Sequence, residues 1–246
     1  MSKKHLISYK MRRFLVVLVV IIAFGCFLAV KMAENEPKQP KTEVSTNSSV
    51  SDEDEKLPLA EDVLAKIEVK GRAPKTGYKR DEFYDDWPKI DGCSLRQRII
   101  KREFGDSAQL KDNCDVISGE YDEPYTGKHQ RFQQKSDISK GVQIDHIVAL
   151  SNAWQTGAQY MSKETRYAMA TDSLNLLAVD SSANQQKSDG DAATWLPANK
   201  SFRCQYIARQ ISVKYKYKLW VTEAEKNAMS GILEKCPNER AVGVEL

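Results

Sequence analysis

The sequence predicts an α+β fold with a strand–strand–helix unit, additional helices and a β-hairpin, preceded by a membrane-spanning segment. Three patterns support this prediction: two short apolar runs that end in polar residues, helical spacing of apolar residues near the C-terminus, and a long uncharged run near the N-terminus. Apolar residues make up 41% of the 246, enough for a packed core. The net charge of +3 is too small to indicate or exclude a nucleic-acid partner.

Residues 1–31 predict a transmembrane segment with a cytoplasmic basic flank. Lysines and arginines precede an uncharged apolar run, Phe14 to Val30, which as a helix spans roughly 26 Å. The basic flank favours the cytoplasmic side, so the rest of the chain is expected outside. We expect an uncleaved anchor because no small-x-small site closes the run. A cleaved signal peptide and a lipid-modified Cys26 are the alternatives.

Residues 32–56 predict a disordered tether. They are rich in Glu, Lys, Pro, Ser and Thr and contain few large apolar side chains. Such a segment cannot bury enough surface to offset the entropy lost on ordering. One extracytoplasmic folded domain is therefore expected over residues 57–246.

The first elements of that domain are predicted from apolar spacing. Helices are expected over Leu59–Val69 and Ser94–Phe104, and a strand and hairpin over Cys114–Phe132, turning near Thr126-Gly127. Val142 and Ile144 then predict a strand that ends at Asp145-His146 and leads into a helix.

A second strand and a short helix complete the strand–strand–helix unit. The apolar run Leu174–Val179 predicts the strand, and Ser181-Ser182 are good N-cap residues for the helix that follows. Asn184 and Lys187 share one face of that helix at i, i+3 spacing. The C-terminal third is expected to be helical, over Phe202–Lys216 and, after a capping box formed by Thr222 and Glu225, up to about Lys235.

The cysteines agree with an exported domain. Apart from Cys26 they form an even set, which in an oxidising compartment predicts disulfides. Three pairings are possible, and local spacing favours Cys93–Cys114 with Cys204–Cys236, each stabilising the fold by about 2 to 4 kcal/mol. A zinc site is the alternative, but no CxxC pair or neighbouring histidine supports it.

Asp145 and His146 are the first candidates for chemistry. Phosphodiester hydrolysis needs a base for water and a cation for the developing charge, and these two side chains can provide the base and a cation ligand. Neighbouring residues on a strand point to opposite sides, so they share a site only if the backbone bends there. Alone, the dipeptide is explained equally well by packing. Polar residues around the second strand, Asn175, Asn184, Lys187 and Asp189, strengthen the hypothesis because they can converge on it.

Two segments together resemble the halves of an HNH motif. They are Gln143-Ile144-Asp145-His146-Ile147-Val148-Ala149-Leu150-Ser151, and Leu174-Asn175-Leu176-Leu177 continuing through Asn184, Lys187 and Asp189. The chain is similar to the HNH module of RNA-guided CRISPR nucleases and to the HNH endonuclease family at the C-terminus of GmrSD-type restriction enzymes. The second likeness extends from about Gly71 to Cys236 and includes Gly71-Arg72-Ala73-Pro74-Lys75-Thr76-Gly77-Tyr78 and Asp191-Ala192-Ala193-Thr194-Trp195-Leu196-Pro197.

The resemblance implies a ββα-metal core and a role for each motif residue. Asp145 and Asn184 would bind the metal, His146 would be the general base, and Asn175 would orient the histidine ring. The strict motif ends in His, whereas this chain has Lys187, which leaves oxygen ligands and favours Mg²⁺ or Mn²⁺. Lys187 would then contact phosphate, and Asp189 would hold a metal-bound water.

Structural explanations remain open for the same residues. Asn184 also suits a helix start and Asn175 a turn cap, while Lys187 and Asp189 also suit a solvated surface. His129, in the expected hairpin, is interpreted as an ordinary surface histidine.

Basic clusters outside the motif are candidate DNA contacts. The first lies in a loop with Gly, Pro and Tyr and comprises Arg72, Lys75, Lys79 and Arg80. A second lies on a predicted helix, where a solvated face explains it equally well: Arg96, Arg98, Lys101 and Arg102. Near the C-terminus, Lys214, Lys216 and Lys218 alternate with Tyr215 and Tyr217 and suggest a further basic, aromatic surface. Trp154 and Trp195 are expected in the core.

The sequence thus predicts a single-pass, extracytoplasmic, metal-dependent endonuclease that acts on DNA or, less favoured, RNA. No small-molecule cofactor is expected, and the membrane is a partner only through the N-terminal helix. Two alternatives stay open: a membrane-tethered DNA-binding protein without catalysis, as in a DNA-uptake apparatus, and a structural envelope protein.

Overall fold

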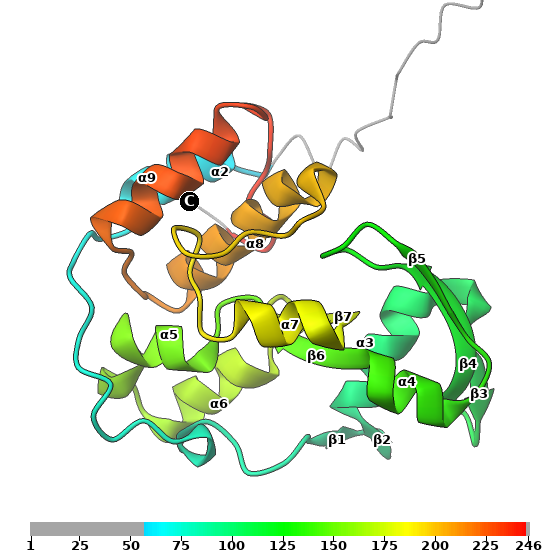
Figure 1. Cartoon of the computed structure of the whole chain (residues 1–246). Coiled ribbons are helices and arrows are strands. Elements are labelled where there is room, and N and C mark those ends of the chain that lie inside the picture. The colour runs from blue at the N-terminus through cyan, green and yellow to red at the C-terminus, as the bar shows by residue number, and fades with distance from the viewer. Residues whose placement is uncertain (1–56, 245–246) are drawn as a thin grey trace, which may run out of the picture. The chain divides into compact units, whose positions relative to one another are not determined.

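An antiparallel pair of strands forms the centre of the computed structural model, which describes residues 57–244. The strands are β6 (Val142–His146) and β7 (Leu176–Asp180), with Asp145 opposite Leu177. Side chains alternate along a strand, so Ile144 packs on one side of the pair and Asp145 lies on the other. Helix α7 (Ser181–Lys187) follows β7 and packs against both strands, as Figure 1 shows.

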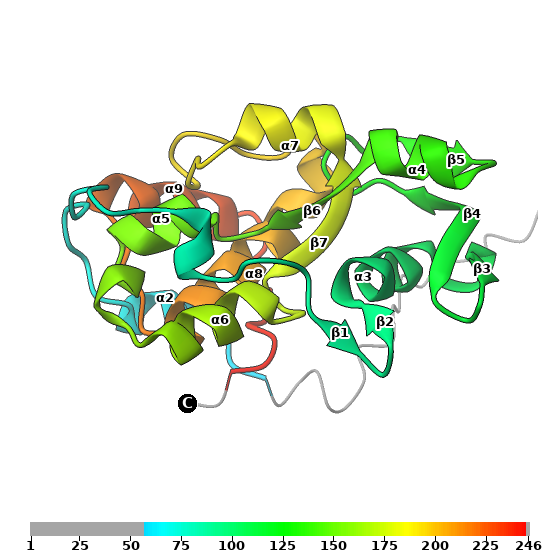
Figure 2. The same cartoon turned by 90° about the horizontal axis from the view of Figure 1, so that it is seen from below.

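The remaining elements flank this unit. Figures 1 and 2 show β3, β4, β5 and α3 at one end of it and α2, α8 and α9 at the other. The strands form a β1–β2 hairpin and a β3–β4–β5 sheet besides the β6–β7 pair. Their bounds are β1 Lys89–Ile90, β2 Cys93–Ser94, β3 Gln109–Lys111, β4 Asp115–Asp122 and β5 His129–Phe132. The helices are α2 Ala60–Lys66, α3 Leu95–Phe104, α4 Lys135–Gly141, α5 Leu150–Gln155, α6 Lys163–Thr171, α8 Arg203–Lys216 and α9 Glu223–Leu233, with 3₁₀ turns η2 Arg80–Glu82, η3 Gly105–Ser107, η4 Ala158–Tyr160 and η5 Lys200–Phe202.

Alternation along β7 joins two hydrophobic cores. Leu177 and Val179 pack with α2, α8 and α9, whereas Leu176 and Ala178 pack with α3 and the β3–β4–β5 sheet. A third cluster lies between α5, α6 and the segment around Phe83. Because β7 is apolar on both faces, it is clamped from both sides, and this fixes the positions of β6 and α7.

The α+β class predicted from the sequence is confirmed, as are most of the predicted elements. Several elements form within a few residues of the expected bounds: the helix starts near residues 59 and 94, the hairpin, and the long C-terminal helices. The first helix ends at Lys66 rather than Val69, because Val69 instead forms a bridge with Val221. The cap of α7 was predicted wrongly: the Asp180 carboxylate accepts the hydrogen bond from the Ala183 amide, in place of Ser181-Ser182.

The predicted anchor at 1–31 and tether at 32–56 lie outside the described residues. Within 57–244, no helix is both long enough and apolar enough to cross a bilayer.

Two disulfides join the described cysteines, Cys93–Cys114 and Cys204–Cys236, in the pairing favoured by local spacing. The first ties the β1–β2 hairpin to the start of β4. The second ties the first turn of α8 to the end of α9. The first disulfide therefore holds a hairpin whose strands are very short, and the second holds the chain just after α9 ends.

Replacing Cys204 and Cys236 together by serine is expected to lower the free energy of unfolding by about 3 to 4 kcal/mol, because the open chain gains loop entropy. Urea denaturation checks this value, and a reductant should shift the wild-type midpoint in the same direction. A midpoint that neither serine nor reductant moves would contradict a stabilising role for the bridge.

Candidate active site

Asp145 lies at the end of β6 with its carboxylate buried between two hydrogen-bond donors. The Tyr125 hydroxyl, from the turn between β4 and β5, donates to Oδ2, and the Lys187 ammonium, from α7, donates to Oδ1 at 2.9 Å. Burial raises the pKa of Asp145, and the Lys187 ammonium and Tyr125 hydroxyl oppose that rise. Side chains from the β4–β5 turn and from α7 thus hold the carboxylate in a fixed position.

Lys187 lies inside the protein and not on its surface. Its side chain is 1% exposed, and Nζ donates to the carbonyl oxygen of His146 at 2.8 Å as well as to Asp145. The sequence-based expectations of a phosphate contact or a solvated lysine are therefore wrong. Lys187 binds both residues of the Asp145-His146 pair, which it reaches because Ala183 and Lys187 share the buried face of α7.

The His146 ring is fixed by a backbone acceptor and by aromatic packing. Nε2 donates to the carbonyl oxygen of Ala170 at 2.9 Å, and the ring stacks on Trp87 at a centroid distance of 6.0 Å and an interplanar angle of 7°. Burial, with a smaller contribution from the Arg80 charge, lowers the pKa of His146 to about 3. The imidazole is therefore neutral near pH 7. Because a carbonyl only accepts, the proton is on Nε2 and Nδ1 carries the lone pair.

Asn175 makes no hydrogen bond to the His146 ring, unlike the direct role implied by the resemblance. Its Oδ1 accepts from the Val148 amide at 2.8 Å, and its Nδ2 donates to the Met169 carbonyl oxygen at 3.3 Å. It thus joins the chain just after His146 to the last turn of α6, where Ala170 holds the imidazole.

Asn184 and Asp189 line the same cleft as Asp145 and His146. This cleft has a volume of about 450 Å³. The Asn184 side-chain nitrogen Nδ2 donates to Oε1 of Gln143 at 2.9 Å. The Asn184 side-chain oxygen accepts no hydrogen bond from the described residues. Asp189 accepts from Lys75 at 2.8 Å and from Ser151 at 3.0 Å, and the Lys75 hydrogen bond lowers the pKa of this carboxyl.

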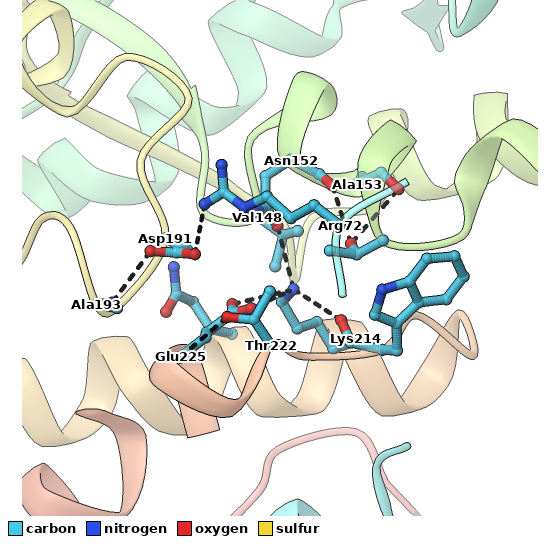
Figure 3. A network of polar contacts seen from close by, with 12 residues as sticks. Arg72, Val148, Asn152, Ala153, Asp191, Ala193, Lys214, Thr222 and Glu225 are labelled. Carbon is cyan, nitrogen blue, oxygen red and sulfur yellow. Dashed lines mark hydrogen bonds and ion pairs between the residues drawn. The ribbon is translucent and has the colours of Figure 1, made fainter. Parts of the chain in front are cut away.

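The predicted basic loop divides into three parts. Lys75 and Arg80 line the cleft, and Lys79 is exposed nearby in sequence. Arg80 also donates to the Tyr84 hydroxyl and lies over that ring. Arg72 instead forms an ion pair with the buried carboxylate of Asp191, as Figure 3 shows, so it is structural in this conformation.

The basic helix α3 braces the central strands. Arg96 donates to the Val142 carbonyl oxygen, and Arg102 donates to the carbonyl oxygens of Ser173 and Leu176. Arg98 reaches Asp91 in the β1–β2 turn. Arg96 and Arg102 therefore stabilise the fold, and the interpretation of this cluster as a DNA-contact surface is not favoured.

The sequence did not indicate the residues that contact the site from distant parts of the chain. Tyr125 and Trp87 carry no motif, and each is separated by many residues from the side chain it contacts. Glu123 was missed as well: its buried carboxylate accepts from the amides of Tyr125, Thr126 and Asp180 and so ties the hairpin turn to the start of α7. A Glu-Pro-Tyr-Thr turn has no pattern that distinguishes this role from an ordinary turn.

His129 is an exposed histidine of β5, in agreement with its interpretation as a surface residue. Its Nδ1 lies 2.8 Å from an Asp122 oxygen, and that hydrogen bond raises its pKa. It takes no part in the cleft.

Fold and cleft together define a class of protein: a disulfide-bonded α+β domain in which a neutral, oriented histidine and a buried carboxylate share a cleft with lysine and arginine. The C-terminal domain of GmrSD restriction endonucleases matches residues 95–232, and the chain belongs to this family. The family inferred from the motif residues is confirmed. The match does not include the Gly71–Tyr78 segment. Membership indicates a nuclease of the restriction-enzyme type, with DNA as the implied substrate.

A relative covers most of this chain. An uncharacterized secreted protein of Arthroderma benhamiae is 37% identical over 180 residues, which cover 72% of this chain and 84% of that protein. No solved structure matches the chain.

Proposed function

We propose that the protein is a metal-dependent HNH endonuclease that hydrolyses DNA phosphodiester bonds outside the cytoplasm. The observation that carries the proposal is the His146 imidazole: it is neutral, oriented through Nε2, and lies at a cleft shared with Asp145 and Asn184. Strands β6 and β7 with α7 would be the ββα core.

His146 is the general base of this mechanism. Its Nδ1 lone pair accepts a proton from a water molecule as the water oxygen attacks phosphorus. The bond from phosphorus to the 3′ oxygen breaks, and that oxygen takes a proton from solvent. The products carry a 5′-phosphate and a 3′-hydroxyl. The Ala170 carbonyl oxygen stabilises the imidazolium that forms, because it continues to accept the hydrogen bond from Nε2.

The residues present fit a divalent cation held by oxygen. Each Asp145 oxygen accepts one side-chain hydrogen bond, and the His146 amide adds a third to the carboxylate, which leaves one of its roughly four acceptor positions. The Asn184 amide oxygen accepts none among the described residues. Mg²⁺ keeps several waters and needs only one or two such protein ligands, and Mn²⁺ accepts the same donors. Asp145 and Asn184 would hold the cation, with Asp189 beside a bound water. A cation held there supplies charge to the phosphate and the departing oxygen.

Another grouping of potential ligands does not offer a metal site. Within 57–244, Cys204, Cys236 and Glu239 come close together, but both sulfur atoms belong to a disulfide and are not thiolates. Metal binding is therefore proposed only at the cleft.

Lys75, Lys79 and Arg80 are the proposed phosphate contacts. Lys75 pairs with Asp189, but its side chain is 54% exposed, and pairs this exposed contribute little to stability, so the ammonium can turn to a phosphate. Arg72 is left out because Asp191 already occupies its guanidinium.

We place the enzyme outside the cytoplasm on two grounds. Both disulfides need an oxidising compartment, and the Arthroderma relative is named as secreted. Attachment to the membrane through residues 1–31 stays a prediction from the sequence.

Plasmid nicking by the full chain tests the proposal. We expect supercoiled DNA to be nicked in Mg²⁺ or Mn²⁺ and to stay intact in EDTA, because the proposed chemistry needs a cation at Asp145 and Asn184. Gel electrophoresis measures the conversion, and end-labelling checks for 5′-phosphates. Retention of DNA without cleavage in Mg²⁺ would favour the non-catalytic DNA-binding alternative. Cleavage that EDTA leaves unchanged would contradict metal dependence.

A further inference from the structure

A second surface of the protein has the composition of a nucleic-acid binding groove. Two hollows, of about 470 and 420 Å³, share Glu68, Lys216 and Lys218 in their walls and so lie side by side; we treat them as one groove. We call it the aromatic groove. Its other defining residues are Lys70, Tyr160 and Trp220. None of these lines the active-site cleft.

Tyr160 is the most exposed large apolar side chain of this groove. It is 73% exposed, although its ring is stacked on Trp220 at a centroid distance of 6.2 Å and an interplanar angle of 27°. Trp220 is itself buried and donates its indole N–H to the Gly71 carbonyl oxygen at 3.1 Å. The tyrosine ring is therefore supported on one face and open to solvent on the other. A fixed, open aromatic face is what base stacking requires.

Lysines line the same groove as this ring. Lys70 lies over Trp220 at 5.3 Å from the ring centroid, and Lys216 and Lys218 also line the groove. Lys218 is exposed and has no ion-pair partner in the described part of the chain. Lys70 pairs with Glu68 through an exposed contact that a phosphate can replace, whereas Lys216 pairs with the largely buried carboxylate of Asp172.

The structure also corrects the basic, aromatic surface suggested by the sequence. Lys214 lines the smaller hollow, but its ammonium is buried, where it pairs with Glu225 and donates to Asn152, as Figure 3 shows, so it offers no free charge to the groove. The Tyr217 hydroxyl donates to Asp172. Tyr160, from a distant part of the sequence, provides the open ring instead.

We propose that the aromatic groove binds a single nucleic-acid strand, with a base stacked on Tyr160 and phosphates at Lys70 and Lys218. This proposal rests on the proposed nuclease function and extends it to the substrate: the strand that is cut in the cleft continues into the groove. Single-strand binding sites combine these two features, a basic groove and aromatic stacking platforms.

One chain segment connects the groove to the cleft. Residues 68–76 include both Lys70 of the groove and Lys75 of the cleft. The segment is held by a bridge between Val69 and Val221 and by the Ala73 amide, which donates to the Gln155 carbonyl oxygen at 2.8 Å. The five residue steps from Lys70 to Lys75 span at most roughly 18 Å. At about 3.4 Å per nucleotide along one strand, that is roughly five nucleotides. Lys75 of the cleft and Lys70 of the groove are therefore close enough in the chain for one strand of moderate length to contact both.

Fluorescence anisotropy on the full chain carrying His146→Ala, which prevents cleavage, tests the groove. The probes are single-stranded oligonucleotides of about 12 and about 4 nucleotides, of which only the longer spans both sites at the spacing above. Tyr160→Ala should weaken binding of the longer probe by about tenfold, the loss expected for one base stack. The shorter probe can occupy only one site at a time, so the same variant should weaken its binding less than that of the longer probe. Lys218→Ala should reduce the salt dependence of the longer probe by about one phosphate contact.

Tyr167→Ala is the matched control. Tyr167 is 43% exposed on α6 and does not line the groove, so its loss should leave both affinities unchanged. Equal binding of the longer probe by the Tyr160 and Tyr167 variants would overturn the groove proposal. The nuclease proposal would stand after that result if the wild type still nicks plasmid. If the wild type neither binds nor nicks DNA, the nuclease proposal fails as well.

Discussion

Replacing His146 by alanine is expected to lower kcat for DNA hydrolysis by about 100- to 10,000-fold, the usual contribution of a general base. The reason is the position of Nδ1, the only unprotonated nitrogen of a ring whose other nitrogen is tied to Ala170. The nicking assay in Mg²⁺ measures the loss. Added imidazole should restore part of the rate, because the deleted ring leaves a space beside Trp87.

His129→Ala is the control for this experiment. His129 is exposed, and its contacts are with Asp122 and Glu120, away from the cleft, so activity should match the wild type. Circular dichroism and the thermal midpoint of both variants separate lost chemistry from lost folding. An active, folded His146→Ala chain would contradict the mechanism.

Replacing Lys187 by methionine is expected to lower the free energy of unfolding by about 3 to 5 kcal/mol, the loss seen when one partner of a buried ion pair is removed. Asp145 would remain buried with the Tyr125 hydroxyl as its side-chain donor, and the His146 carbonyl oxygen would also lose a donor. Urea denaturation measures the loss. Adding Asp145→Asn should recover part of the stability, because the uncompensated charge is removed, while nuclease activity stays absent.

Lys75→Met provides the matched comparison. It removes the same ammonium from an exposed ion pair with Asp189, and its effect on stability should stay within about 1 kcal/mol. If the two lysine variants are equally stable, the buried pair between Lys187 and Asp145 does not exist in the folded protein.

Much of the fold could be predicted because its central elements are defined locally. The apolar runs of β6 and β7 and the helical spacing of α8 are visible in short windows. Thr222 caps α9 as expected, by accepting from the Glu225 amide. The Glu225 side chain, however, turns away to Lys214, so the capping box is not reciprocal. Tertiary pairing with a buried lysine outweighed the local motif.

Other elements lacked such a signal. Helices α4 (Lys135–Gly141) and α6 (Lys163–Thr171) are short and largely polar, and they were not predicted. Their helical state depends on packing: Ile138 of α4 lies in the core around α3, and Met169 of α6 lies in the core around Phe83.

The candidate site was predictable in its residues but less so in their contacts. Motif spacing brought Asp145, His146 and Asn184 to one cleft. The same spacing placed Lys187 nearby but did not indicate that it is buried. The partners that fix the site, Tyr125 and Ala170, are reached only through the folded backbone, so short sequence windows contain no trace of them.

The ion pair between Asp145 and Lys187 means that folding should not depend on the cation proposed to bind at Asp145. Many small metal-binding domains unfold when a chelator removes the ion, because only the ion neutralises their buried ligands. Here the chain carries its own counter-charge at Asp145. If the proposed mechanism holds, the domain should complete its disulfides and reach its final conformation without divalent ions, and only its activity should depend on the cation.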